Sequence, residues 1–239
     1  MITWTSLSNL GDIASAMLLA AGIAGFFFMR RAWQLALWWM ALFGGGLMLV
    51  VASKVAFVGW GIGHQAFDFT GFSGHAMRAM AILPVLAYLA AGKSPVPVRI
   101  IAVLTCSMVG ALVGFSRYLL HVHSYSEVIA GGLLGAILSG GFIFILRKKH
   151  VISFYPPLLI LAFAPLLIPS YLGATPTQGW IIKLSQYLSG HEQVFVRDGW
   201  KFVTPANTVV ISTPGLHVSF PSSVLQGASP NASDFVAEN

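Results

Sequence analysis

The chain has 239 residues, of which 56% are hydrophobic and only 8% are charged. A typical soluble domain carries about a quarter charged residues, so this composition excludes an ordinary water-soluble globule. The formal net charge of +6 does not indicate nucleic-acid binding, because the basic residues fall in small groups between apolar runs. The single cysteine, Cys106, excludes an intrachain disulfide. We therefore expect a membrane protein that binds no nucleic acid.

Six apolar segments are candidates for membrane-spanning helices, since a span needs about 20 residues and about 17 are tolerated. Four prolines make the sixth segment the least regular, because proline removes a backbone donor. Residues 1–170 thus form a predicted all-α, six-helix transmembrane domain. Its spans are expected at about 13–29, 32–53, 75–92, 100–115, 128–146 and 151–170.

Basic residues in the short connections predict how the spans are oriented. Cytoplasmic connections of membrane proteins carry an excess of Lys and Arg. Seven of the 13 basic residues lie in the connections after the first, third and fifth spans, which we assign to the cytoplasm: Arg30, Arg31, Lys93, Arg99, Arg147, Lys148 and Lys149. The loops 54–74 and 116–127 then lie on the outer side, together with residues 171–239.

The tail, residues 171–239, has a different pattern from the apolar part of the chain. A short helix is predicted at 178–189. Residues 194–203 alternate around Asp198-Gly199, which is a strong β-hairpin signal. A second hairpin is predicted around Pro214-Gly215, and the end of the tail is small, polar and expected to be disordered.

Titratable residues stand at the outer ends of the predicted spans. Charged side chains at membrane depth are costly and mark functional sites. Because the topology brings these helix ends to one interface, we expect a single site. Its candidate residues are Lys54, His75, Arg78, Arg117, His123 and Glu127.

The spacing of two of these residues indicates a nucleophile. His123 and Glu127 are four apart and share a helix face if the helix has begun by His123. A carboxylate that binds one imidazole nitrogen fixes the tautomer and leaves the other nitrogen free to attack. His75, beside a bound anion, could protonate a leaving oxygen.

The remaining residues suit a phosphate group. Arg117 offers a planar fork to phosphate oxygens, and Lys54 adds a point charge. Gly74 permits close backbone approach at a helix start, where exposed N–H groups favour an anion. No cysteine or second carboxylate completes a metal site with the histidines. We expect phosphoryl transfer without a metal or another cofactor.

These residues resemble signatures of the type 2 phosphatidic acid phosphatases. Ser116-Arg117, five residues, His123, three residues and Glu127 resemble the third signature, Ser-Arg-x5-His-x3-Asp. Phe72-Ser73-Gly74-His75 is similar to the second, Pro-Ser-Gly-His. The match covers about residues 54–146.

The first signature, Lys-x6-Arg-Pro, is incomplete in this chain. Lys54 stands where it begins, but Gly61 replaces its arginine. Arg78 follows His75 by three residues and lies on the same helix face. We therefore predict that Arg78 supplies the missing guanidinium.

The resemblance implies a phosphatase-type helical bundle and a metal-independent lipid phosphate phosphatase. It assigns His123 as the nucleophile that forms a phosphohistidine, Glu127 as its orienting partner and His75 as the general acid. The residues implied to hold the phosphate are Lys54, Ser73, Gly74 and Arg117.

Several alternatives stay open at this point. The substrate could be a polyprenyl diphosphate, phosphatidylglycerol phosphate, phosphatidic acid or a lipid A phosphate. The same phosphohistidine would serve a lipid phosphotransferase, and the missing arginine also fits a non-catalytic lipid-phosphate binding or transport protein. The expected partners are the bilayer and its lipid phosphate, with no oligomeric state implied. We expect a bacterial inner membrane, with the active site and tail on the outer face.

Overall fold

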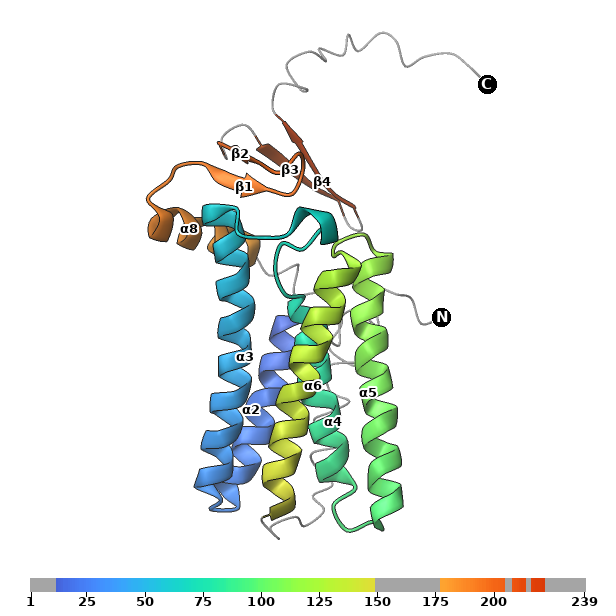
Figure 1. Cartoon of the computed structure of the whole chain (residues 1–239). Coiled ribbons are helices and arrows are strands. Elements are labelled where there is room, and N and C mark those ends of the chain that lie inside the picture. The colour runs from blue at the N-terminus through green and yellow to red at the C-terminus, as the bar shows by residue number, and fades with distance from the viewer. Residues whose placement is uncertain (1–11, 149–176, 205–207, 214–215, 222–239) are drawn as a thin grey trace, which may run out of the picture.

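The computed structural model describes residues 12–148, 177–204, 208–213 and 216–221, and this part of the chain is mostly helical. The predicted span at 151–170 and the predicted disordered end lie outside the described residues. The helices are α2 (Ile13–Met29), α3 (Trp33–Trp60), α4 (Gly74–Ala90), α5 (Val96–Leu119), α6 (Tyr125–Lys148) and α8 (Thr177–Ser189), with a 3-10 turn, η2 (Gln65–Phe67). Figure 1 shows α2 to α6 side by side in a bundle, with α8 across the end of α3.

Two small antiparallel sheets lie beyond the same end of the bundle (Figure 1). One sheet pairs β1 (Val194–Val196) with β2 (Lys201–Val203), and the tight turn between them contains Gly199 with a φ of 72°. The other pairs β3 (Thr208–Thr213) with β4 (Leu216–Pro221). The tail therefore contains a helix and two hairpins in the described residues.

Three helices, α3, α5 and α6, are long and apolar enough to cross a membrane. The apolar helices α2 and α4 are shorter, at 17 residues each. The prediction of a mainly helical fold is confirmed, and the three long apolar helices are consistent with a membrane protein. Helices α2 to α6 correspond to the first five predicted spans. Six spans are not established by the described residues.

Several helices extend beyond the charge-free segments that predicted them. The sequence predicts that α3 ends at residue 53, but the helix continues to Trp60. The charged side chain of Lys54 does not interrupt the backbone hydrogen bonds of the helix. Gly61 ends α3 in the left-handed conformation, with a φ of 68°. Lys54 consequently lies within α3, which corrects the expectation that it stands at the helix end.

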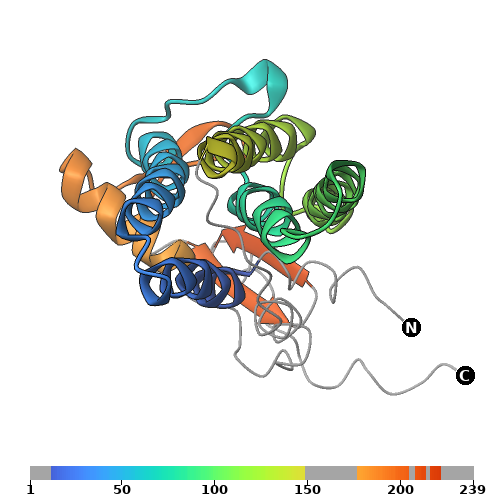
Figure 2. The same cartoon turned by 90° about the horizontal axis from the view of Figure 1, so that it is seen from below.

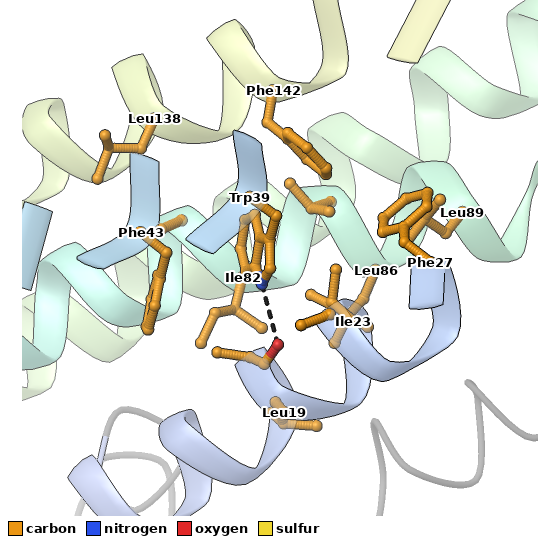
Figure 3. Close-up of a cluster of buried hydrophobic side chains, with 14 of the residues drawn as sticks. Leu19, Ile23, Phe27, Trp39, Phe43, Ile82, Leu86, Leu89, Leu138 and Phe142 are labelled. Carbon is orange, nitrogen blue, oxygen red and sulfur yellow. Dashed lines mark hydrogen bonds between the residues drawn. The ribbon is translucent and has the colours of Figure 1, made fainter. Parts of the chain in front are cut away.

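The core joins α2, α3, α4 and α6 around large apolar side chains (Figure 3). Trp39 of α3 stacks on Phe43 and packs against Phe142 of α6. Its indole Nε1 donates a hydrogen bond of 2.9 Å to the Ala20 carbonyl oxygen of α2. This bond satisfies the one polar atom of a fully buried tryptophan.

Helix α4 packs against both α5 and α6 and also contacts α2 (Figure 2). Its contact with α6 is close because Gly131 and Gly135 have no side chains. A Cβ at Gly131 would overlap the Ser73 carbonyl oxygen, and one at Gly135 would overlap that of Met77. Small residues allow membrane helices to approach in this way. The contact sets the start of α4 directly against the first turns of α6.

The two ends of the bundle differ in their side chains. The end of α3, the start of α4, the end of α5 and the start of α6 meet at the end that carries α8 and the sheets (Figure 1). The opposite end holds six of the predicted cytoplasmic basic residues: Arg30, Arg31, Lys93, Arg99, Arg147 and Lys148. The seventh, Lys149, lies outside the described residues.

We expect Gly131→Ala to lower the free energy of unfolding by about 1–3 kcal/mol, because the methyl group would collide with the Ser73 backbone. Gly132→Ala is the matched control, since a Cβ there meets nothing within 4 Å. The control should be neutral or stabilising, because alanine favours helix. Thermal unfolding in detergent measures both, and equal stability of the two variants would contradict the close α4–α6 contact.

Candidate active site

Four helices and one connection bring the predicted titratable residues together. Lys54 comes from α3, His75 and Arg78 from α4, Arg117 from α5 and Glu127 from α6. His123 lies in the connection before α6. Three cations, Lys54, Arg78 and Arg117, lie within electrostatic reach of His75. The imidazole of His123 does so as well.

His123 and Glu127 form a hydrogen-bonded pair, with 2.6 Å between Nδ1 and Oε2. The two residues would share a helix face only if the helix had begun by His123, but α6 begins at Tyr125. The contact between His123 and Glu127 therefore has another cause. The Ser124 N–H donates to Glu127 Oε2 at 3.3 Å, and the Glu127 N–H donates to Ser124 Oγ at 3.4 Å. Ser124 and Glu127 thus form a capping box at the start of α6. It holds the Glu127 carboxylate beside His123, the residue before Ser124.

The other carboxylate oxygen of Glu127 is also fully used. Oε1 accepts hydrogen bonds from the Thr70 N–H at 2.9 Å, from the Thr70 hydroxyl and from Nη2 of Arg197. The Glu127 side chain is only 1% exposed. An ionised carboxylate only accepts hydrogen bonds, so Nδ1 of His123 carries the proton in this pair. Nε2 of His123 is then left with its lone pair.

Burial lowers the pKa of His123 from its ordinary value of 6.5. The hydrogen bond to Glu127 opposes that shift, whereas the positive charges of Lys54 and Arg117 add to it. The net result is a lowered pKa. His123 is therefore a neutral imidazole at neutral pH, as a nucleophile must be.

The turn before α4 contains one buried hydroxyl without a hydrogen-bond partner among the described residues. Ser73 is fully buried, and its Oγ has no hydrogen-bond partner among the residues described. Its backbone N–H donates to the Glu127 carbonyl oxygen at 3.1 Å, which ties the turn to α6. Ser73 precedes α4 without capping it through its side chain. An anion at this helix start would meet free donors.

Arg78 folds back toward the start of its own helix. Its Nη2 lies 3.4 Å from Nδ1 of His75, and the whole residue is 7% exposed. A Cβ at Gly74 would lie 2.9 Å from Nη1 of Arg78, so the guanidinium occupies the space above that glycine. The structure thus places Arg78 beside His75 at the start of α4, and its replacement of the missing arginine stays a prediction.

Gly61, which stands where the first signature has its arginine, is covered by the tail. Ring atoms of Phe195, on β1, would lie 3.0 Å from a Cβ at Gly61. Gly61 also has a left-handed φ of 68°, which side chains rarely adopt. An arginine at position 61 would therefore be strained and would require Phe195 to shift.

Three residues of the site were not found from the sequence. Thr70 and Arg197 contact Glu127, and Asp68 binds Arg197 with 3.3 Å between Oδ1 and Nε. None of them belongs to a recognisable motif. The pairing of Ser124 with Glu127 could have been found, because Ser-x-x-Glu before an apolar run is a capping-box signal.

No group of three or more His, Cys, Asp or Glu side chains within the described ranges could hold a metal ion. His75 and His123 are instead surrounded by cationic side chains. These charges suit an anion such as a phosphate ester.

The fold and the site define a helical membrane protein with a histidine–carboxylate pair among cations at one end of its bundle. A family model described as the PAP2 superfamily matches residues 56–151. An uncharacterized 22.5 kDa protein in the cps region of Klebsiella pneumoniae is 33% identical over 201 residues, covering 82% of this chain and 96% of the relative. No solved structure matches the chain.

The chain belongs to the PAP2 superfamily, the type 2 phosphatidic acid phosphatases and their relatives. Members of this family are generally phosphatases, which supports hydrolysis of phosphate esters. The matched segment includes every predicted site residue except Lys54, which lies just before it.

We expect the NMR titration of His123, in protein labelled with ¹⁵N-histidine, to have a midpoint below 6.5. In Glu127→Gln the midpoint should fall further, because the negative charge that favours the imidazolium is removed. The opposite shift in that variant, or a wild-type midpoint above 6.5, would contradict the burial and pairing described for His123.

Proposed function

We propose that this protein is an integral membrane phosphatase that hydrolyses a phosphate monoester or diphosphate on a membrane lipid, through a phosphohistidine on His123. One observation carries the proposal: His123 Nδ1 is bound to buried Glu127 at 2.6 Å, which leaves Nε2 available among cations. Family membership supports phosphatase action on phosphate esters.

The phosphate is held by charges and donors from three helices. Lys54, Arg78 and Arg117 neutralise its oxygens, which is the main catalytic need in phosphoryl transfer. The unpaired Ser73 hydroxyl donates to one oxygen. The backbone N–H groups at Gly74, the start of α4, add their dipoles.

In the first step, Nε2 of His123 attacks phosphorus in line with the leaving oxygen. The bond from phosphorus to that oxygen breaks as the bond to Nε2 forms. His75 gives its proton to the leaving oxygen, and the negative charge of the bound phosphate favours the protonated imidazole that this requires. Glu127 keeps the proton of His123 on Nδ1 and stabilises the charge that develops on the ring.

In the second step, water attacks the phosphohistidine. His75, now neutral, accepts a proton from the water as the nitrogen–phosphorus bond breaks. Inorganic phosphate leaves, and both histidines return to their starting forms. No metal or other cofactor takes part in either step of this proposal.

The position of the site suits a lipid substrate. It lies at one end of an apolar bundle, so acyl or prenyl chains stay in the bilayer while the phosphate meets the cations (Figure 1). The basic residues at the opposite end favour a cytoplasmic location for that end. The proposed location of the site and tail is therefore the outer face of a bacterial inner membrane, and the bacterial source of the similar protein supports only a bacterial origin.

The test is phosphate release by purified protein in detergent with EDTA. The lipid panel contains a polyprenyl diphosphate, phosphatidylglycerol phosphate, phosphatidic acid and a lipid A phosphate. We expect release from at least one lipid, and a loss of more than about 1,000-fold in His123→Ala. His121→Asn is the matched control, because His121 is exposed and asparagine tolerates its φ of 55°.

Release that persists in His123→Ala would contradict the proposed nucleophile. Transfer of the phosphoryl group to an added lipid alcohol in preference to water would identify a phosphotransferase. Binding of a lipid phosphate without turnover would identify a non-catalytic binding protein.

A further inference from the structure

The hairpin of β1 and β2 is anchored on the outer end of α3 by aromatic side chains. Phe57 of α3 makes edge contacts with Phe195 and Trp200, each with ring centroids 5.4 Å apart. Phe195 also covers Gly61, and Val194 is buried beside Phe57 and Val58. The absence of a side chain at Gly61 allows this docking, so the position of the hairpin is determined by α3.

The docked hairpin brings Arg197 to the candidate active site. Nη2 of Arg197 donates to Glu127 Oε1, and to Thr70 Oγ1 at 3.1 Å. Nε of Arg197 faces Asp68 Oδ1 at 3.3 Å. The guanidinium therefore bridges the connection before α4, the buried carboxylate of α6 and the tail.

Glu127 needs such a partner because a buried carboxylate without a countercharge is costly. His123 is neutral when its pKa is lowered, so it does not neutralise Glu127. Arg197 forms the ion pair to Oε1, on the oxygen opposite the one that binds His123. Together they fix both oxygens of the carboxylate and therefore its plane.

We propose that Arg197 is a positioning residue of the active site: from the tail hairpin it holds the Glu127 carboxylate in the orientation that binds Nδ1 of His123. The outer tail is then part of the catalytic unit. This inference rests on the proposed function. The Nε and Nη2 donors of Arg197 face Asp68, Thr70 and Glu127, so its role differs from the phosphate-binding role of Arg117.

Steady-state kinetics on the lipid phosphate that the wild type hydrolyses best gives the first test. We expect Arg197→Ala to lower kcat by about 10- to 100-fold, the effect of losing a charge-assisted hydrogen bond, with KM changed less than about twofold. Lys201→Ala removes an exposed positive charge from the same hairpin and should leave both constants unchanged.

Two further variants separate positioning from simple folding. Guanidinium ion in solution, at non-denaturing concentration, should restore part of the activity of Arg197→Ala, because the Arg197 side chain is 36% exposed and its space opens to water. Arg197→Lys should recover only part of the activity, since an ammonium cannot match the fork that meets Asp68 and Glu127. A merely structural loss would not respond to guanidinium.

A second readout does not depend on turnover. The titration midpoint of His123 by NMR should rise in Arg197→Ala, because a cation is removed and Glu127 is freed to favour the imidazolium. It should not move in Lys201→Ala. The other charged or titratable groups near His123 stay in place in both variants: Lys54 from α3, His75 from α4, Arg117 from α5 and Glu127 from α6. Arg78 of α4, which faces His75, also stays in place.

The outcomes distinguish this inference from the proposed function. A raised KM with unchanged kcat would show that Arg197 binds the phosphate and would overturn the positioning role. Unchanged kcat together with an unchanged His123 titration would also overturn it, while leaving the phosphatase intact. If the wild type hydrolyses no lipid, the proposed function fails, and the His123 titration alone decides whether Arg197 controls the pair.

Discussion

The arrangement of the candidate site depends on one buried charge, the carboxylate of Glu127. A carboxylate that is 1% exposed must be matched by donors, because leaving it unpaired would cost several kcal/mol. Those donors come from His123 and Ser124 beside α6, from Thr70 in the connection before α4, and from Arg197 in the tail. The site is therefore complete only when the bundle, the connection before α4 and the hairpin are assembled together.

The same constraint explains a departure from the family signature. The third signature ends in aspartate, but this chain has Glu127, whose extra methylene lets it serve as the capping partner of Ser124. The arginine position of the first signature is occupied by Gly61, which lies under Phe195. At both positions the residue present has a defined contact, Glu127 with Ser124 and Gly61 with Phe195 of the tail.

Much of the bundle could be predicted from the sequence, because apolar length alone indicates membrane helices. The limits of α2 match the charge-free segment at 13–29, whereas α3 continues past Lys54 since hydrogen bonding in a helix does not stop at a charge. Clustering of Lys54, His75, Arg117 and Glu127 followed from topology. The contact of Arg197 with Glu127 could not be predicted, because 70 residues separate the two in the sequence. Their contact depends on how Phe195 and Trp200 pack against Phe57.

We propose that Nε2 of His123, oriented through Glu127, carries the phosphoryl group during turnover. The most direct measurement is a rapid alkaline quench during hydrolysis of a lipid phosphate, followed by mass spectrometry of the proteolysed protein. Alkali preserves the nitrogen–phosphorus bond of a phosphohistidine. We predict a phosphoryl group on His123, attached at Nε2. A phosphoryl group on another residue would contradict this role of His123. Turnover without any phosphorylated residue would also contradict it.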